Sequence, residues 1–597
     1  MTVLQNLKQK LSIQRRSLKV FLLIKTPKIL LVFGLFWQTF IGVAGAQETI
    51  YRTEDIFHPV AAKNGMVSSQ EELATRAGLE VLKEGGNAVD AAVTVGFTLA
   101  VTLPRAGNLG GGGFMLIHLD KTGETIAIDY REKAPLKATK NMFLDENGEV
   151  DRQKSMFSHL AVGVPGTVAG MAMVLEKYGT ISLERALQPA IELAEKGFPV
   201  SQDFRRSLIF AKKRMQAYPA SMEIFYKPDG EVYEVGEIFL QKDLAKSLKL
   251  IAKQGISAFY RGEIADKIVA EMQANGGLIS KADLAAYKPV IRQPIKGNYR
   301  GYDIYSMPPP SSGGIHLVQM LNLLEKFSLR SLGHNTAQTL HLMTESMKLA
   351  YADRSKYLGD SDFVNVPISQ LISKRYADIL RRKINQNRAT PSNKIAPGNP
   401  NIISESKETT HYSVIDKYGN AVANTYTLNF SYGTGITASG TGILLNNEMN
   451  DFVAKPGVPN AYGLIGGEFN AIQPQKRMLS SMTPTIVIKE DEPFLVTGSP
   501  GGSRIITTTL QLITNVIDHQ MNIAQATNAF RVHHQWYPDR LQVENGLNGD
   551  TIRLLTDIGH EVVEVNAIGS TQSVMRIDGI LYGASDPRRL GALTLGY

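Results

Sequence analysis

Cysteine is absent from all 597 residues of the chain. This absence excludes disulfides, thiolate nucleophiles and zinc–thiolate sites. The eleven histidines contain no HExxH pattern, and the adjacent His533 and His534 would point to opposite faces of a strand. We therefore expect no metal site and no cofactor.

Acidic residues are absent from positions 1–46, which hold seven lysines and arginines. Leaving out these seven positive charges reduces the net charge of the chain from +8 to +1 (8 − 7). The rest of the chain is nearly balanced in charge, so the composition gives no reason to expect a nucleic acid partner.

After residue 46, no segment of the sequence is apolar enough to cross a membrane. Before it, the run at residues 29–43 follows the basic segment and leads to the small residues Ala44–Ala46, the pattern of a cleaved export signal. Its 15 residues are fewer than the roughly 20 that a spanning helix needs. Residues 1–46 are predicted to be the signal peptide of a periplasmic or secreted protein, with a retained membrane anchor as the less favoured alternative.

Two helical patterns and a strand hairpin open the sequence after the leader. Ser69 and Glu72 match a capping box ahead of an apolar helical period, which predicts a first helix. Asn87 can cap a second helix that is apolar nearly all round and therefore buried. Strand patterns around a turn follow at residues 108–132, and helical patterns prevail over residues 165–385. This order predicts a layered α/β fold.

The composition changes at residues 384–408, which contain three prolines, five asparagines and no helical or strand period. We expect a long exposed linker here, and such linkers inside compact chains are often functional. Strand patterns return from Thr409, with hairpins expected at residues 411–428 and 483–498. The predicted linker thus ends where a strand begins.

Thr409 and Thr410 stand at this junction. A threonine hydroxyl becomes a nucleophile when a base removes its proton, and the base can be the residue's own α-amine, freed by cutting the preceding peptide bond. Such an amine has a pKa of about 8, so a useful fraction is unprotonated near neutrality. Two threonines also begin many strands without any catalytic role. On these two residues alone, the purely structural interpretation is favoured.

A glycine turn at residues 497–504, TGSPGGSR, lies between a strand pattern and a helical pattern. The N–H groups of such a turn can hold a phosphate or an oxyanion. The lysine of a phosphate-binding P-loop is absent, which argues against a nucleotide. An ordinary strand-to-helix turn stays open as the alternative.

Charged and hydroxyl side chains elsewhere would suit a ligand that carries both a carboxylate and an ammonium group. Arg131, Ser480 and Ser481 can hold a carboxylate. Glu448 and Asp451, three residues apart, can converge on one cation. Each of them alone is more typical of a surface or capping role, and the sequence does not show that they meet.

Nine longer motifs follow one another through nearly the whole chain after the leader: LKEGGNAVDAA, GNLGGGGFM, MPPPSSGG, LAYADRS, TTHYSVIDKYGNAVANTYTLN, LLNNEMNDF, LSSMTPT, GSPGGSR and YGASDPR. In order and spacing they resemble the γ-glutamyltranspeptidases, a family of N-terminal-nucleophile hydrolases. The resemblance implies a four-layer αββα sandwich, made as an inactive precursor that cuts itself between Glu408 and Thr409. It also implies a heterodimer of a large subunit, residues 47–408, and a small subunit, residues 409–597.

The same resemblance implies roles for single residues. Thr409 would attack the γ-glutamyl amide of glutathione or a related compound, and the acyl group would pass to water, an amino acid or a dipeptide. Thr427 would hydrogen-bond the nucleophile, and Tyr462 would be the aromatic gate of a lid loop. The other implied site residues would hold the α-ammonium group (Asn429, Glu448, Asp451), the α-carboxylate (Arg131, Ser480, Ser481) and the oxyanion (Gly501, Gly502).

Two other functions stay open at this point. An acylase of the same fold would act on glutaryl or cephalosporin side chains, but the lid-like segment 455–467 favours the transpeptidase. A catalytically silent periplasmic protein would bind amino acids or peptides, and it would need no nucleophile, oxyanion turn or linker. The chain departs from many bacterial relatives at Glu448, where they carry glutamine. Both side chains accept from an ammonium group, so the role is kept while affinity and pH response change.

Overall fold

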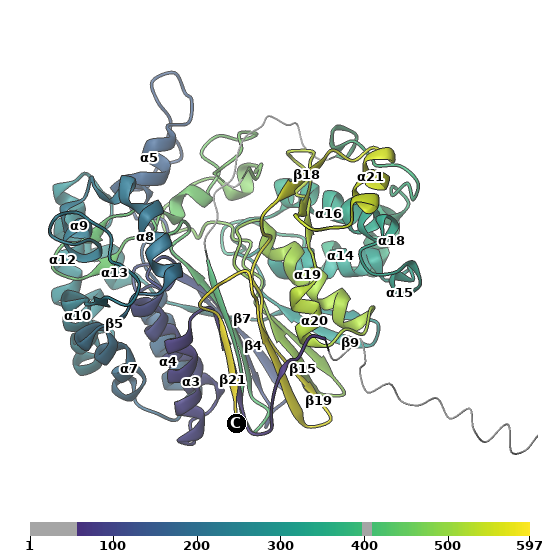
Figure 1. The fold of residues 1–597 in the computed structure, drawn as a ribbon. Helices are drawn as coiled ribbons and strands as arrows, with labels where there is room; N and C mark the ends of the chain where they lie inside the picture. Colours follow the sequence, from purple (N-terminus) through teal and green to yellow (C-terminus); the bar gives the residue numbers. More distant parts are fainter. Residues whose placement is uncertain (1–55, 397–408, 462) are drawn as a thin grey trace, which may run out of the picture. The chain divides into compact units, whose positions relative to one another are not determined.

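Two antiparallel β-sheets form the centre of the protein (Figure 1). The computed structural model describes residues 56–396, 409–461 and 463–597. The predicted leader and the predicted site residues Glu408 and Tyr462 lie outside the described residues.

Thr409 directly precedes a central strand of the first sheet. The strands of this sheet are, in order, β21 (Leu593–Gly596), β2 (Met66–Ser69), β10 (Thr410–Ile415), β11 (Ala421–Thr427), β3 (Gly112–Leu119), β4 (Glu124–Tyr130) and β7 (Val290–Arg292). Neighbouring strands are antiparallel throughout. The hairpins predicted at residues 108–132 and 411–428 are confirmed as β3–β4 and β10–β11, and the β11–β3 pair joins them.

The second sheet contains the other predicted hairpin, at residues 483–498. Its strands, in sheet order, are β1 (Val60–Ala62), β20 (Ile580–Ser585), β19 (Gln572–Ile577), β15 (Glu492–Thr497), β14 (Thr485–Lys489), β9 (Tyr302–Ser306) and β8 (Ile295–Tyr299). Strands β14 and β15 form the expected hairpin, and β15 leads into the glycine turn.

Alternate side chains of the first sheet face the second sheet. Phe114 and Leu116 of β3 belong to an apolar cluster with Ile486 of β14 and Val574 of β19. Met115, between them in sequence, belongs instead to the cluster beneath the helices. Both faces of these strands are therefore buried, as the two-residue alternation of a sheet between two layers requires.

Helices cover the outer face of each sheet (Figure 1). The first sheet is covered by α3 (Glu72–Lys83), α4 (Ala88–Thr102), α6 (Thr167–Tyr178), α7 (Leu183–Lys196) and α10 (Lys242–Gln254), among others. The second is covered by α14 (Gly313–Leu324), α16 (Ala337–Tyr357), α18 (Lys374–Arg381), α19 (Arg504–Ile517) and α20 (Ile523–Asn528). The expected αββα sandwich is confirmed.

Helix α4 is the second predicted helix, and all fifteen of its residues are buried, as expected. Asn87 caps it, accepting hydrogen bonds from the N–H groups of Val89 (2.9 Å) and Asp90 (3.0 Å). None of the helices in the described part of the chain is both long enough and apolar enough to cross a membrane.

The first predicted helix starts differently from the expectation. Ser69 ends β2, and Glu71 caps α3, because its carboxylate accepts from the N–H groups of Leu73 and Ala74 at 3.0 Å each. The predicted capping box of Ser69 is therefore wrong. A glutamate directly before the helix reaches the same unpaired N–H groups that a serine cap would satisfy.

Part of the predicted exposed linker is buried. Ala389, Ser392 and Ile395 are at most 8% exposed. The Ala389 N–H donates to the Ile558 carbonyl (2.8 Å), and the Trp536 indole N–H donates to the Ser392 carbonyl (3.0 Å). Composition suggested exposure, but an irregular segment can be buried when distant residues satisfy its backbone groups.

Candidate active site

Thr409 directly precedes β10, and only 4% of its surface is exposed. The β10–β11 register pairs Thr410 with Tyr426, so one further step along both strands places Thr409 opposite Thr427. Strand β10 is also paired with β2 on its other side. The sheet therefore fixes the backbone on which Thr409 stands.

His411 is the imidazole nearest to Thr409 in sequence, two residues along the same strand and on the same face. Its Nδ1 lies 2.8 Å from Thr425 Oγ1 and its Nε2 lies 3.0 Å from Ser413 Oγ. Burial lowers the pKa of His411 to about 3. This ring is neutral with both nitrogens engaged, so it is not available as a base for Thr409.

Thr427 and Asn429 end β11 in a fixed turn. The Asn429 N–H donates to Thr427 Oγ1 (2.7 Å), and Asn429 Nδ2 donates to the Asn447 carbonyl (2.9 Å). Asn429 has φ 75°, a left-handed conformation that asparagine adopts more readily than most residues. These bonds hold the polar side chains of Thr427 and Asn429 beside Thr409.

Hydrogen bonds from the segment 310–312 and from Arg354 position Ser480 and Ser481. The Ser480 N–H donates to the Pro310 carbonyl, and the Ser312 N–H donates to the Ser480 carbonyl, both at 2.8 Å. Ser481 Oγ accepts a hydrogen bond from Arg354 Nη2 (3.3 Å). The sequence motif MPPPSSGG thus positions two predicted site residues about 170 positions away (480 − 310 = 170).

Arg131, which follows β4, contacts both carboxylates that the sequence assigns to the ammonium end of the ligand. Its Nη1 lies 2.5 Å from Glu448 Oε2, and its Nη2 lies 2.5 Å from Asp451 Oδ2. A third carboxylate, Glu132 Oε2, lies 3.5 Å from Nη1. The sequence suggested that these charges share a pocket, but it gave no sign that they pair with one another.

Three carboxylates around one guanidinium leave an excess of negative charge in a buried site. Burial raises the pKa of Glu448 and of Asp451, against the lowering effect of Arg131. Burial also raises the pKa of Glu132 to about 8, and neither of its carboxyl oxygens has a hydrogen-bond partner among the described residues. The Glu132 carboxyl therefore retains its proton at neutral pH.

Gly501 and Gly502 form the turn between β15 and α19, with φ of 131° and 56°. Residues with a side chain rarely adopt these values, so the turn requires glycine. The turn precedes the N-terminus of α19, where backbone N–H groups create a positive end that suits an anion. No side chain caps this helix end.

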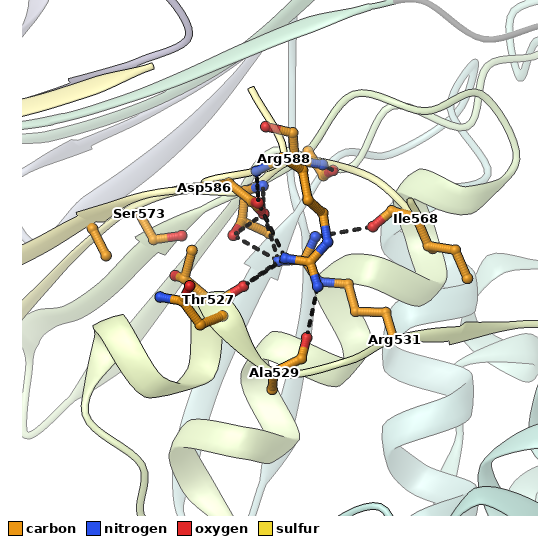
Figure 2. A network of polar contacts seen from close by, with 12 residues as sticks. Thr527, Ala529, Arg531, Ile568, Ser573, Asp586 and Arg588 are labelled. Carbon is orange, nitrogen blue, oxygen red and sulfur yellow. Dashed lines mark hydrogen bonds and ion pairs between the residues drawn. The ribbon is translucent and has the colours of Figure 1, made fainter. Parts of the chain in front are cut away.

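A buried charge network supports this turn (Figure 2). Arg531 donates through Nη1 to the Ile568 carbonyl (2.9 Å) and pairs through Nη2 with Asp586 Oδ2 (2.6 Å). Two residues after Ile568, the Ser570 N–H donates a hydrogen bond to Ser499 Oγ (2.9 Å), which belongs to the glycine turn. The network therefore holds the segment against which the turn rests.

The predicted site residues meet at one cavity of about 20 Å³, room for about one water molecule. Its lining includes Arg131, Thr409, Thr427, Asn429, Glu448, Asp451, Ser480, Ser481 and Gly502. Gly501 does not line it but precedes Gly502 in the turn. Their roles stay predictions, and Glu408 and Tyr462 lie outside the described residues.

Four polar residues at this site were not predicted: Glu132, Arg354, Asn460 and Ser503. Arg354, Asn460 and Ser503 line the cavity, and Glu132 borders Arg131. Arg354 lies in the motif LAYADRS, on a helix where most residues are buried. An arginine among buried neighbours could have indicated a binding role.

One group of side chains in the described part of the chain has the composition of a metal site: the buried residues His341, Glu345 and His560. His341 Nδ1 lies 2.9 Å from His560 Nε2, and Glu345 Oε1 lies 3.0 Å from Lys348 Nζ. These internal contacts already pair the atoms that would bind the ion. None of the three residues lines the cavity of Thr409.

The Glu132 carboxyl makes the stability of the fold depend on pH. Folding raises its pKa from 4.5 to about 8, so its contribution is present below about pH 4.5 and is lost as pH rises toward 8. Glu132→Gln keeps the shape of the neutral form. Between about pH 5 and pH 8.5 the unfolding free energy of wild type should fall, and in Glu132→Gln the fall should be smaller by on the order of 1–3 kcal/mol. Urea titration at each pH measures the unfolding free energy.

The matched control is Glu490→Gln, at a glutamate whose side chain is 87% exposed. This variant should keep the wild-type pH response. Equal slopes of unfolding free energy against pH for wild type and Glu132→Gln would contradict the prediction.

Comparisons with known proteins agree with this geometry. The model of a family described as Gamma-glutamyltranspeptidase matches residues 74–595. The glutathione hydrolase proenzyme of Escherichia coli (strain K12) is 57% identical over 546 residues, covering 91% of this chain and 94% of that protein. A cephalosporin acylase from Bacillus halodurans superposes with TM-score 0.82 at 29% identity, over 93% of this chain and 99% of that chain. A Helicobacter pylori γ-glutamyltranspeptidase chain matches with TM-score 0.54 at 51% identity, over 55% of this chain and 93% of that chain.

Proposed function

The chain belongs to the γ-glutamyltranspeptidase family, and we propose that it is a self-processing enzyme that hydrolyses and transfers the γ-glutamyl group of glutathione and related compounds. Water, amino acids and dipeptides are the acceptors. The 57% identity to a glutathione hydrolase proenzyme over 91% of the chain supports this proposal. So does the meeting of nine predicted residues at one cavity.

The processing step cuts the peptide bond between Glu408 and Thr409. It yields a large subunit, residues 47–408, and a small subunit, residues 409–597. The sheets support a heterodimer that persists after the cut, because strands of the two parts alternate. In the first sheet, β10 and β11 of the small part lie between β2 and β3 of the large part.

The cut supplies the base that the site otherwise lacks. The new α-amine of Thr409 takes the proton of the Thr409 hydroxyl, and Oγ attacks the γ-carbonyl carbon of the donor. The N–H groups of Gly501 and Gly502 stabilise the oxyanion. The amine then gives its proton to the leaving nitrogen as the C–N bond breaks, which leaves a γ-glutamyl ester on Thr409.

One observation favours a γ-glutamyl donor over an acyl group without an ammonium: the site contains the charge pattern of the γ-glutamyl group. Arg131 pairs with Glu448 and Asp451 in a cavity that has room for about one water. A bound donor must replace these internal pairs. Its α-carboxylate binds Arg131, Ser480 and Ser481.

The ammonium group of the same donor binds Glu448, Asp451 and Asn429, so each buried charge keeps a partner. A glutaryl donor has no ammonium group. Binding it through Arg131 would leave two buried carboxylates without their cation, and unpaired buried charges are costly.

This reasoning is tested with two chromogenic donors, γ-glutamyl-p-nitroanilide and glutaryl-p-nitroanilide. We expect kcat/KM to be at least about 100-fold higher for the γ-glutamyl donor, because a site built for a charged group rejects the analogue that lacks it. An equal or higher value for the glutaryl donor would instead favour an acylase. Turnover of neither donor by a single uncut chain would favour a binding protein.

The location of the enzyme is proposed from the leader. Residues 1–46 have the pattern of a cleaved export signal, which supports a periplasmic or secreted enzyme.

A further inference from the structure

A second and larger cavity adjoins the cavity of Thr409. Its volume is about 240 Å³, against about 20 Å³ for the first. Five residues line both cavities: Arg354, Asp451, Asn460, Leu464 and Leu479. A ligand in the larger cavity would therefore lie next to whatever occupies the smaller one.

Three arginines line the larger cavity, and two of them, Arg214 and Arg354, are at least partly buried. In the described part of the chain, no carboxylate forms an ion pair with the guanidinium of Arg214 or of Arg354. Arg354 is 6% exposed and donates only to hydroxyls, Ser312 Oγ (3.0 Å) and Ser481 Oγ (3.3 Å). Burial lowers the pKa of Arg354 to about 10.

Arg214, at the C-terminal end of α8 (Gln202–Met215), is partly buried. Its guanidinium lies 5.6 Å from the centre of the Phe157 ring, and one Nη donates to the Ser431 carbonyl. Its Nε is buried and has no hydrogen-bond partner among the described residues. Burial lowers the pKa of Arg214. The charge of Asp451 acts on Arg354, whereas only tyrosines act on Arg214. A partly buried cation without a counter-ion is costly, so Arg214 indicates an anionic ligand.

The remaining wall suits an organic body rather than a bare inorganic anion. Phe157 and Phe430 line the cavity with their ring centres 5.9 Å apart, and Met156, Leu358 and Leu464 extend the apolar surface. Pockets for small molecules combine such apolar walls with a few placed charges. An amino acid or short peptide with a free C-terminal carboxylate has both parts.

We propose that the larger cavity is the acceptor subsite, and that Arg214 binds the C-terminal carboxylate of the acceptor. The proposal rests on the proposed function. The amine of the acceptor points across the shared boundary to the ester on Thr409, while Arg354 lies between the two ligands. The same subsite holds the carboxylate of the peptide that leaves when glutathione is the donor.

The transfer step balances without any further reactant. The acceptor amine attacks the acyl carbon of the γ-glutamyl ester, a C–N bond forms, and the bond from that carbon to Thr409 Oγ breaks. The proton of the amine passes through the α-amine of Thr409 to Oγ. The enzyme returns to its starting state with a new γ-glutamyl amide as the product.

The first test needs only the wild-type enzyme and two acceptors, glycylglycine and glycylglycinamide, with γ-glutamyl-p-nitroanilide as donor. The assays are run where both acceptor amines are largely unprotonated. We expect kcat/KM for the acceptor to be roughly 10- to 100-fold higher for glycylglycine, because a charge-assisted contact is lost with the amide. Equal values would overturn the proposal.

The second test changes the arginine. Arg214→Gln should lower kcat/KM for glycylglycine by roughly tenfold or more and change the value for glycylglycinamide by less than about threefold. Arg214→Lys should fall between the two enzymes. The matched control is Lys213→Gln, which removes an exposed charge from the adjacent position of α8 and should keep the wild-type acceptor ratio.

Two results overturn the proposal: unchanged kcat/KM values for both acceptors in Arg214→Gln, or an equal loss for both. Failure of the proposed function is separate, because it would appear as no release of p-nitroaniline by the wild-type enzyme without any acceptor. If the wild-type enzyme releases p-nitroaniline without an acceptor but has equal kcat/KM values for the two acceptors, only the acceptor subsite is refuted.

Discussion

Thr409→Ala is expected to give one uncut polypeptide with no turnover of γ-glutamyl-p-nitroanilide. The change removes the hydroxyl that we propose attacks the backbone during processing and the substrate afterwards. His411, two residues further along the chain, cannot replace it, because its ring is neutral and both nitrogens are engaged. We expect the rate to fall by at least about 10³-fold, as for other enzymes that lose their nucleophile.

Denaturing gels and the release of p-nitroaniline measure the two effects. Thr409→Ser keeps a hydroxyl at the same position and should still process and turn over at a reduced rate. Thr410→Ala is the matched control for a small change in the same strand, and it should be cut and active. Processing that persisted in Thr409→Ala would contradict the role of this residue.

Arg131→Ala is expected to have the second largest effect, a fall of roughly 10²- to 10⁴-fold in kcat/KM for the γ-glutamyl donor, with KM raised. The change removes the group proposed to bind the α-carboxylate. It also leaves Glu132, Glu448 and Asp451 buried without their cation. Removing one partner of a buried charge pair costs about 3–5 kcal/mol, which corresponds to this range.

Self-cleavage should survive in Arg131→Ala, because β10 and β11 fix the backbone of Thr409 independently of this side chain. The uncompensated carboxyl groups should hold their protons more strongly, so the variant should lose stability more steeply than wild type as pH rises. Arg131→Lys keeps the charge but not the two-pronged contact, and it should lie between wild type and Arg131→Ala. A donor kcat/KM equal to that of wild type would remove Arg131 from the binding site.

Local patterns in the sequence carried much of the fold. The β10–β11 and β14–β15 hairpins, the glycine turn and the cap of α4 depend on neighbouring residues, and the structure has all of them. The first helix was expected with the wrong cap, because Ser69 and Glu71 can satisfy the same N–H groups. Such a choice is decided by the strand that Ser69 completes.

Contacts between distant segments could not be predicted from these patterns. Arg131 pairs with carboxylates more than 300 positions away (448 − 131 = 317), so only the folded sheets bring them together. The burial of Ser392 likewise depends on Trp536, which no local period connects to it. Residue types alone made most of the site residues candidates, and the resemblance added Thr427 and Asn429 and gave all of them roles. The internal ion pairs and the position of Arg354 came from the structure.

N-terminal sequencing of the purified, active protein tests the central claim most directly. The account predicts two chains, one of which begins Thr-Thr-His-Tyr-Ser at Thr409. An active protein that consists of one uncut chain, or a smaller chain that begins at another residue, would contradict it.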